Sequence, residues 1–194
     1  MKKIIYAAML LLGLSIMASC EKEGTEADKG KLEGKWWVAE KFEVRFNGEV
    51  IKSFPTLEEA EWIVDKGHFE NGNVMLETDG DIGTYSYSFY NNTLIILGIS
   101  LDIVKLTSKE LVLDMILGKG NLIQWEITAE DLKEGQLLAQ YKGKDIYSRS
   151  GITYLPPYWY YDNKGNAVLC GHYGDLGDSN MYWYDTERYY FKAE

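Results

Sequence analysis

Cysteine is scarce in this chain, and several catalytic signatures are missing from it. Its two cysteines, Cys20 and Cys170, are too few for the disulfide framework that holds many small secreted domains together, so the fold must depend on its hydrophobic core. The sequence contains no Gly-x-Ser-x-Gly motif, no phosphate-binding loop and no dinucleotide-binding fingerprint. We therefore predict no catalytic residues, no cofactor and no enzymatic activity.

Basic residues are in deficit as well. The chain has 20 lysines and arginines against 30 aspartates and glutamates, which gives a formal net charge of -10. A surface of this sign repels the phosphates of nucleic acids and the head groups of anionic lipids. We therefore expect no nucleic-acid partner, and we interpret the excess of acidic residues mainly as a contribution to solubility.

Only the N-terminus carries a long hydrophobic run. Residues 4–17 are almost entirely apolar, but they are too few to cross roughly 30 Å of hydrocarbon as a helix. A short positive start at residues 1–3 precedes the run, and the small pair Ala18-Ser19 follows it. This arrangement is typical of a secretory signal peptide, which we assign to residues 1–19.

The residue after this segment is Cys20, and the stretch "MASC" resembles the lipobox of bacterial lipoproteins. Met17 stands where leucine is usual, a looser pattern that is similar to that of Bacteroidetes lipoproteins. The resemblance implies that the Cys20 thiol is acylated and anchors the protein in the outer membrane, on the periplasmic face or at the cell surface. The alternative is a plain secretory signal with a chance cysteine. After acylation Cys170 is the one remaining free thiol.

Residues 20–31 predict a flexible tether between the anchor and the folded part. The stretch is charged, contains Gly24 and Gly30 and has no large apolar residue, so it offers nothing to bury in a core. Glu21 and Glu23 resemble the acidic export signal of surface lipoproteins in Bacteroidetes, although Lys22 lies between them.

Beyond Gly34 the sequence is dominated by short strand patterns separated by turn residues such as Asn47-Gly48. One short helix is expected over residues 56–64, where Thr56 and Glu59 form a capping-box pattern. The short connections favour an antiparallel meander, and about eight strands are enough to close into a small barrel. The predicted strands are KWWVAEKFEVRF, VDKGHFE, VMLET, TYSYSFY, TLIILG, SLDIVKLT, LVLDMILG and LIQWEIT.

The order of these segments resembles that of bacterial lipocalin-like lipoprotein domains. The resemblance rests on "LEGKWWV" at residues 32–38, followed by "HFENGNVMLE", "GTYSYSFYNNTLIIL" and "DIVKLTSKELVLDM". It covers residues 32–128 and implies an all-β fold in which the meander closes into a lipocalin-like β-barrel. Such a barrel has room for one small apolar ligand. Strand alternation gives the interior candidates, which are Trp37, Tyr87, Phe89 and Trp125.

Residues 129–194 differ in composition and resemble no family with confidence. After a polar connection at 129–136 they are crowded with aromatic residues, as in "YWYYDNKGNAVLC" and "MYWYDTERYYF". About sixty residues without disulfides would be marginal alone. We therefore expect an aromatic-rich C-terminal β extension packed on the barrel.

The aromatic residues of this extension suggest an alternative function, as an accessory or interaction module of an envelope complex that handles glycans. Stacking on a sugar or contact with an envelope protein would need an exposed aromatic surface. The candidates are Tyr158, Trp159, Trp183 and Tyr184. The competing interpretation is that both faces of "PPYWYY" are buried between layers.

Two further clusters contain reactive residue types. Cys170 and His172 lie two apart on one strand, but no third group orients them as a nucleophile and base, and no second ligand pair suggests zinc. Asp79 and Asp81 resemble the start of a calcium loop, yet Gly83 stands in the next ligand position. We therefore predict no metal site and interpret the Asp79 region as a hairpin turn.

Overall fold

The computed structural model describes residues 26–54, 64–120, 127–149 and 158–194. Three sequence predictions fall mostly outside the described residues: residues 56–63 of the helix expected over 56–64, the lipobox with Cys20, and residues 122–126 of the strand LIQWEIT, which include Trp125. Within the described ranges, none of the helices has the length and apolar character that a membrane crossing requires.

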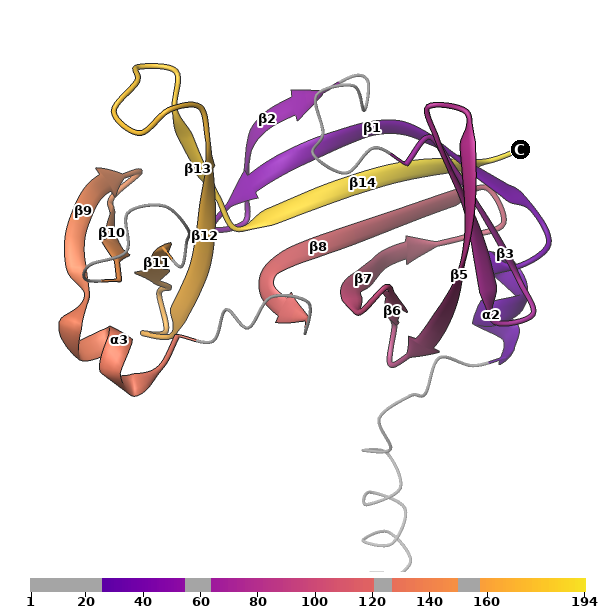
Figure 1. The fold of residues 1–194 in the computed structure, drawn as a ribbon, viewed down its shortest axis with the longest axis horizontal. Helices are drawn as coiled ribbons and strands as arrows, with labels where there is room; N and C mark the ends of the chain where they lie inside the picture. The colour runs from indigo at the N-terminus through magenta and orange to yellow at the C-terminus, as the bar shows by residue number, and fades with distance from the viewer. Residues whose placement is uncertain (1–25, 55–63, 121–126, 150–157) are drawn as a thin grey trace, which may run out of the picture.

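Eight antiparallel strands close into a β-barrel, as the sequence predicts (Figure 1). The barrel closes where β14 pairs with β1 on one side and β8 on the other. A ninth strand, β2 (Glu49–Phe54), pairs with β1. The barrel strands are β1 (Trp36–Phe46), β3 (Lys66–Glu70), β4 (Asn73–Thr78), β5 (Asp81–Tyr90), β6 (Thr93–Ile96), β7 (Ile99–Leu106), β8 (Glu110–Gly120) and β14 (Thr186–Ala193).

Tight turns join several of these strands. Asn71 and Gly72 between β3 and β4, and Asp79 and Gly80 between β4 and β5, all have positive φ angles, which Asn, Asp and Gly tolerate best. The Asp79 region is therefore a hairpin turn, as predicted.

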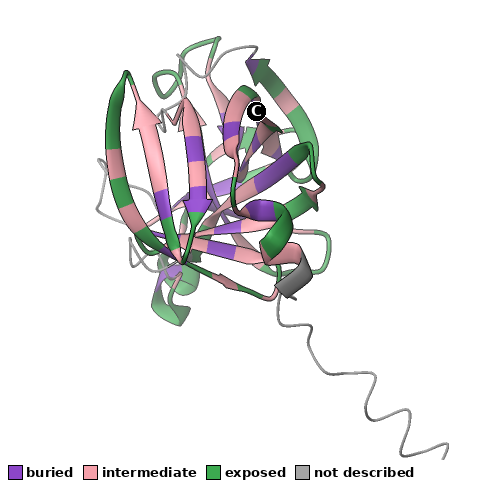
Figure 2. Ribbon diagram, turned by 90° about the vertical axis from the view of Figure 1, so that its right-hand side faces the viewer, coloured by how far each residue is buried: buried purple, intermediate pink, exposed green. Residues whose placement is uncertain are grey.

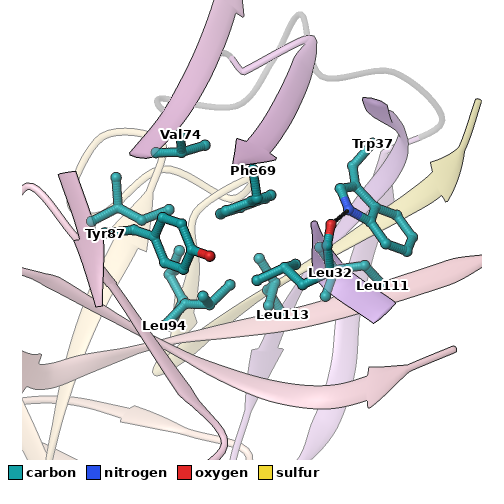
Figure 3. Packing of buried hydrophobic residues seen from close by; sticks show 10 residues of the cluster. Leu32, Trp37, Phe69, Val74, Tyr87, Leu94, Leu111 and Leu113 are labelled. Atoms are coloured by element: carbon teal, nitrogen blue, oxygen red, sulfur yellow. Dashed lines mark hydrogen bonds between the residues drawn. The ribbon is translucent and has the colours of Figure 1, made fainter. Parts of the chain in front are cut away.

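Alternate residues of the barrel strands point into the barrel and form its core. Figure 2 shows buried residues alternating with less buried ones along the strands. A short helix, α2 (Glu26–Leu32), covers one end of the barrel and buries Leu32 completely. The indole Nε1 of Trp37 donates a hydrogen bond of 2.8 Å to the carbonyl of Leu32 (Figure 3). The buried cluster comprises Leu32, Trp37, Phe69, Val74, Tyr87, Leu94, Ile96, Leu101, Leu111 and Leu113.

Helix α2 corrects the expected extent of the tether. Residues 26–31 were expected to be flexible, but they are helical and carry an ion pair between Asp28 and Lys31 with an N–O distance of 2.9 Å. The helix forms because the burial of Leu32 fixes its C-terminal end, a tertiary effect that the polar composition of the segment conceals.

A second sheet of five antiparallel strands forms a half-barrel beside the first barrel (Figure 1). Helix α3 (Ala129–Glu134) precedes it. Phe46 at the end of β1 packs into the core of this sheet with Ile146, Tyr158, Tyr160, Cys170 and Trp183. The strands are β9 (Gln136–Tyr141), β10 (Lys144–Ser148), β11 (Tyr158–Tyr161), β12 (Ala167–Tyr173) and β13 (Tyr182–Tyr184).

The chain therefore divides differently from the expected boundary between 32–128 and 129–194. Strand β14, at the end of the aromatic-rich half, is a wall of the barrel, where Trp37 pairs with Ala193 and Phe42 with Tyr189. The half-barrel is an insertion between two barrel strands, β8 and β14. Pairing between the first and last strands is not encoded in local alternation, which is why the sequence boundary was wrong.

Candidate ligand-binding site

The barrel interior contains an apolar cavity of about 50 Å³. Residues from β1, β3, β4, β6, β7, β8 and β14 surround it, together with Val64 just before β3. Inward-facing positions of these strands converge there because side chains alternate between the two faces of each strand. The lining residues are Trp37, Val64, Gly67, Phe69, Leu76, Ile96, Leu101, Leu111, Leu113, Tyr189 and Phe191.

The cavity offers little to a polar ligand. Among the lining residues, only Trp37 and Tyr189 carry a side-chain nitrogen or oxygen. The Trp37 indole is hydrogen-bonded to Leu32, and the Tyr189 hydroxyl donates to the carboxylate of Glu187. Because a buried polar group without a partner is costly, this site favours an apolar ligand over a charged one.

The size of the cavity restricts the ligand further. A dry protein cavity of roughly 150 Å³ is known to bind benzene, and pockets for drug-sized ligands measure roughly 300 to 1,000 Å³. At about 50 Å³ this cavity is much smaller, because the side chains of the barrel fill most of its interior. It suits a narrow group, such as part of one unbranched alkyl chain.

The sequence-predicted ligand residues have different positions. Trp37 lines the cavity. Tyr87 lies in the core beside it, where its hydroxyl donates to Glu33 at 2.5 Å, and Phe89 packs against the same core. Burial, reinforced by Glu33, raises the pKa of Tyr87, so its hydroxyl stays protonated at physiological pH. Trp125 lies outside the described residues.

Sequence reasoning missed Tyr189 and Phe191, which line the cavity from β14. The alternation of Glu187, Tyr189 and Phe191 along "TERYYFKA" is a signal for one buried strand face. Assignment of this segment to the extension hid that signal.

Two buried carboxylates lie between the cavity and the half-barrel. Glu187 accepts hydrogen bonds from Tyr189 and, at 3.0 Å, from Tyr173. Asp185 accepts from the Tyr160 hydroxyl at 2.6 Å and from the backbone nitrogen of Asn47 at 2.5 Å. Burial, with the nearby Glu187 carboxylate, raises the pKa of Tyr189. These bonds define a polar layer that joins the barrel to the half-barrel.

The expected aromatic interaction surface is corrected. Its four candidates are 7% (Tyr158), 1% (Trp159), 1% (Trp183) and 7% (Tyr184) exposed. Tyr158 packs edge-to-face on Trp183 in the half-barrel core, with ring centroids 5.0 Å apart. Trp159 lies on the other face of β11, against Tyr147 and close to Gly135 after α3. Residues 158–160 of β11 are therefore buried on both faces, as the competing interpretation expects, whereas Tyr161 at the end of the strand is 39% exposed.

Cys170 is also a residue of the half-barrel core. It is 1% exposed, and burial, with Asp185 nearby, raises the pKa of its thiol, so the reactive thiolate is disfavoured. His172 lies on the same strand with its Nδ1 2.8 Å from the Gly174 carbonyl and its ring against Trp183. Within the described part of the chain, no three His, Cys, Asp or Glu side chains form a group able to hold a metal ion.

Comparison with known proteins adds no relative. No protein-family model matches the chain, and searches of curated proteins and of solved structures find no match either. The barrel and its cavity are therefore the basis for a functional proposal.

Proposed function

We propose that this protein is a lipid-anchored, non-catalytic binding protein of the bacterial envelope that holds a small apolar ligand in its barrel. The observation that carries the proposal is the cavity in the barrel interior, whose two polar lining side chains are already hydrogen-bonded within the protein. A catalytic site would instead need polar groups directed at a bound substrate.

The preferred ligand is a narrow alkyl group. A cavity of about 50 Å³ accepts a thin chain more readily than a ring, and longer chains require rotation of flexible lining side chains such as Leu76 and Leu101. Each methylene that leaves water contributes about 0.8 kcal/mol. A few buried methylenes therefore give weak to moderate affinity.

The proposed anchor fits this ligand class. If Cys20 is acylated, the chain between it and Glu26 at the start of α2 spans at most about 20 Å when fully extended. The barrel end covered by α2 then stays close to the membrane, which is a source of alkyl chains. The other partners considered, a glycan or an envelope protein, would need a surface other than the four buried aromatic residues.

The test is binding of 1-octanol to the secreted chain carrying Cys20→Ser, which lacks the acyl anchor and needs no detergent. The matched variant is Gly67→Val. A Cβ at Gly67 makes ordinary contacts of 3.5 to 4.0 Å with Leu76, Phe69 and Val74, so a side chain at this position points toward the cavity lining, and we expect the methyl groups of valine to occupy part of the cavity.

Methyl NMR of the leucines and methionines is the measurement, and Gly30→Ala on the exposed side of α2 is the control, because nothing lies within 4 Å of its added Cβ. We expect octanol to shift methyl signals in the parent and the control but not in Gly67→Val. Equal shifts in all three, or shifts in none, would contradict the proposal.

A further inference from the structure

Three side chains on neighbouring barrel strands form an outward-facing row. Trp36 on β1 pairs directly with His68 on β3, and His68 pairs directly with Met75 on β4. The neighbours Trp37, Phe69 and Val74 face the buried interior, so by alternation Trp36, His68 and Met75 share the outer face. All three are partly exposed.

His68 is the central residue of this row, and its imidazole has unused bonding capacity. The Nδ1 atom is buried and has no hydrogen-bond partner in the described structure. The ring of Trp36 lies beside it, with centroids 5.2 Å apart and planes inclined at 53°. A buried ring nitrogen without a partner is costly in a folded protein, so it requires an explanation.

Met75 supplies a second donor of a different kind. Side chains directly opposite each other in an antiparallel pair have Cβ atoms about 4.5 to 5.5 Å apart. The imidazole of His68 and the flexible thioether of Met75 are therefore able to reach the same ion. Thioether sulfur is a soft ligand that selects Cu(I), and imidazole also binds copper well.

We propose that His68 and Met75 bind a soft monovalent cation, Cu(I) or its analogue Ag(I), with the Trp36 ring covering the ion. The electron-rich face of an indole attracts a cation that lies within about 6 Å of it. Hard or tetrahedral ions such as Mg²⁺ and Zn²⁺ fit poorly, because they require oxygen donors or four ligands. This site is separate from the cavity and does not depend on the ligand proposed there.

The surrounding charges favour a cation. On the same outer face, Glu70 follows His68 on β3 and Glu77 follows Met75 on β4, with Lys66 opposite Glu77. The two carboxylates outnumber the one ammonium group, so the local potential attracts positive ions.

The other histidine provides an internal control. His172 also lies against a tryptophan, Trp183, with ring centroids 5.5 Å apart. However, its Nδ1 is engaged by the carbonyl of Gly174, and its direct cross-strand partner is Trp183, not a methionine. It is therefore expected to bind no soft cation.

The experiment titrates Ag(I), as nitrate in chloride-free buffer, into the full chain carrying Cys20→Ser and follows binding by calorimetry and by NMR of labelled methionine methyl groups. We expect one ion to bind and the Met75 methyl signal to move. His68→Gln should abolish this site, Met75→Leu should weaken it by about tenfold or more, and His172→Gln should leave it unchanged.

Two results would overturn the proposal. One is undiminished affinity in both His68→Gln and Met75→Leu, with circular dichroism showing that the variants are folded. The other is loss of binding in Cys170→Ala, which would assign the silver to the buried thiol. Quenching of the Trp36 fluorescence, identified by its loss in Trp36→Phe, supports the position of the ring over the ion.

Discussion

The barrel and the half-barrel are packed with different kinds of side chain. The barrel is closed on itself and lined by aliphatic residues with a few rings, and it keeps a cavity between them. The half-barrel is an open sheet whose concave face is filled by Phe46, Tyr158, Tyr160 and Trp183. The ring centroids of Phe46 and Tyr160 are only 4.6 Å apart. Continuous hydrogen bonding holds the barrel walls apart, whereas the open sheet is stabilised by the rings that fill it.

Asp185 lies at the junction between the two regions. Asp185 precedes β14, and its backbone nitrogen donates to the Arg45 carbonyl at 2.8 Å while its carboxylate accepts from Tyr160 of the half-barrel. We infer that this junction lets the aromatic sheet support one end of the ligand-binding barrel. The predictions below test that relation, beginning with the largest effect.

Removal of a large ring from either region should cost the most. Trp37 is fully buried in the barrel and Trp183 is 1% exposed in the half-barrel, so each change to alanine should lower the free energy of unfolding by about 3 to 5 kcal/mol. Urea denaturation followed by circular dichroism measures both. If the regions fold as one unit, each variant shifts a single transition, and a second transition in Trp183→Ala would show that they are independent.

Loosening of the junction should have a smaller effect. In Asp185→Asn a neutral amide replaces the carboxylate whose Oδ2 accepts bonds from both Asn47 and Tyr160, so these buried bonds lose the charge that strengthens them. We expect a loss of about 1 to 3 kcal/mol. Calorimetry should show a broader transition than in the parent protein. Asp114→Asn, which removes a partner of Arg188 on the barrel wall, is the comparison, and equal broadening there would contradict a special role for Asp185.

Acid should weaken the capping box at the start of α3, which leads into the half-barrel. The Arg149 guanidinium, with the Thr128 backbone and hydroxyl, holds the pKa of Asp131 well below its usual range, in a capping box at the start of α3. A lowered pKa in the folded state means that the stabilisation is present at neutral pH, above the ordinary aspartate pKa of about 3.9. It is lost as the pH falls through the lower folded value.

Substitution of Asp131 should have the smallest effect on stability, because it removes only this capping interaction. Asp131→Asn should be less stable than the parent at pH 7, and the difference should shrink below about pH 4 as the parent loses the same interaction. Urea titrations at pH 7 and pH 3, followed by tryptophan fluorescence, measure it. A difference between the two proteins that is independent of pH would exclude the ion pair as its source.

Much of the barrel could be predicted from sequence because its determinants are local. Alternation identifies β1 and β5, and turns such as Asn71-Gly72 separate the strands. Closure into a barrel was predicted, but the strand that completes it was not, because β14 pairs with β1 across nearly the whole chain. Alternation gives each strand two faces but does not state what covers them.

The candidate site was likewise predictable where it depends on local alternation and unpredictable where it depends on distant segments. Trp37 was predicted from alternation, and it lines the cavity. Tyr189 and Phe191 were missed because their strand was assigned to the wrong region, and Tyr158 and Trp159 were expected to be exposed although α3 and the half-barrel core cover them. Burial of a ring is a property of packing between distant segments, which a single sequence does not contain.

Native mass spectrometry of the Cys20→Ser chain, expressed in the protein's own host cells and purified without detergent, tests the central claim most directly. We predict a second mass above that of the polypeptide, corresponding to one small apolar molecule, which collisional activation releases and which Gly67→Val lacks. A bare polypeptide mass in both proteins, together with no response to 1-octanol, would contradict a ligand-binding barrel.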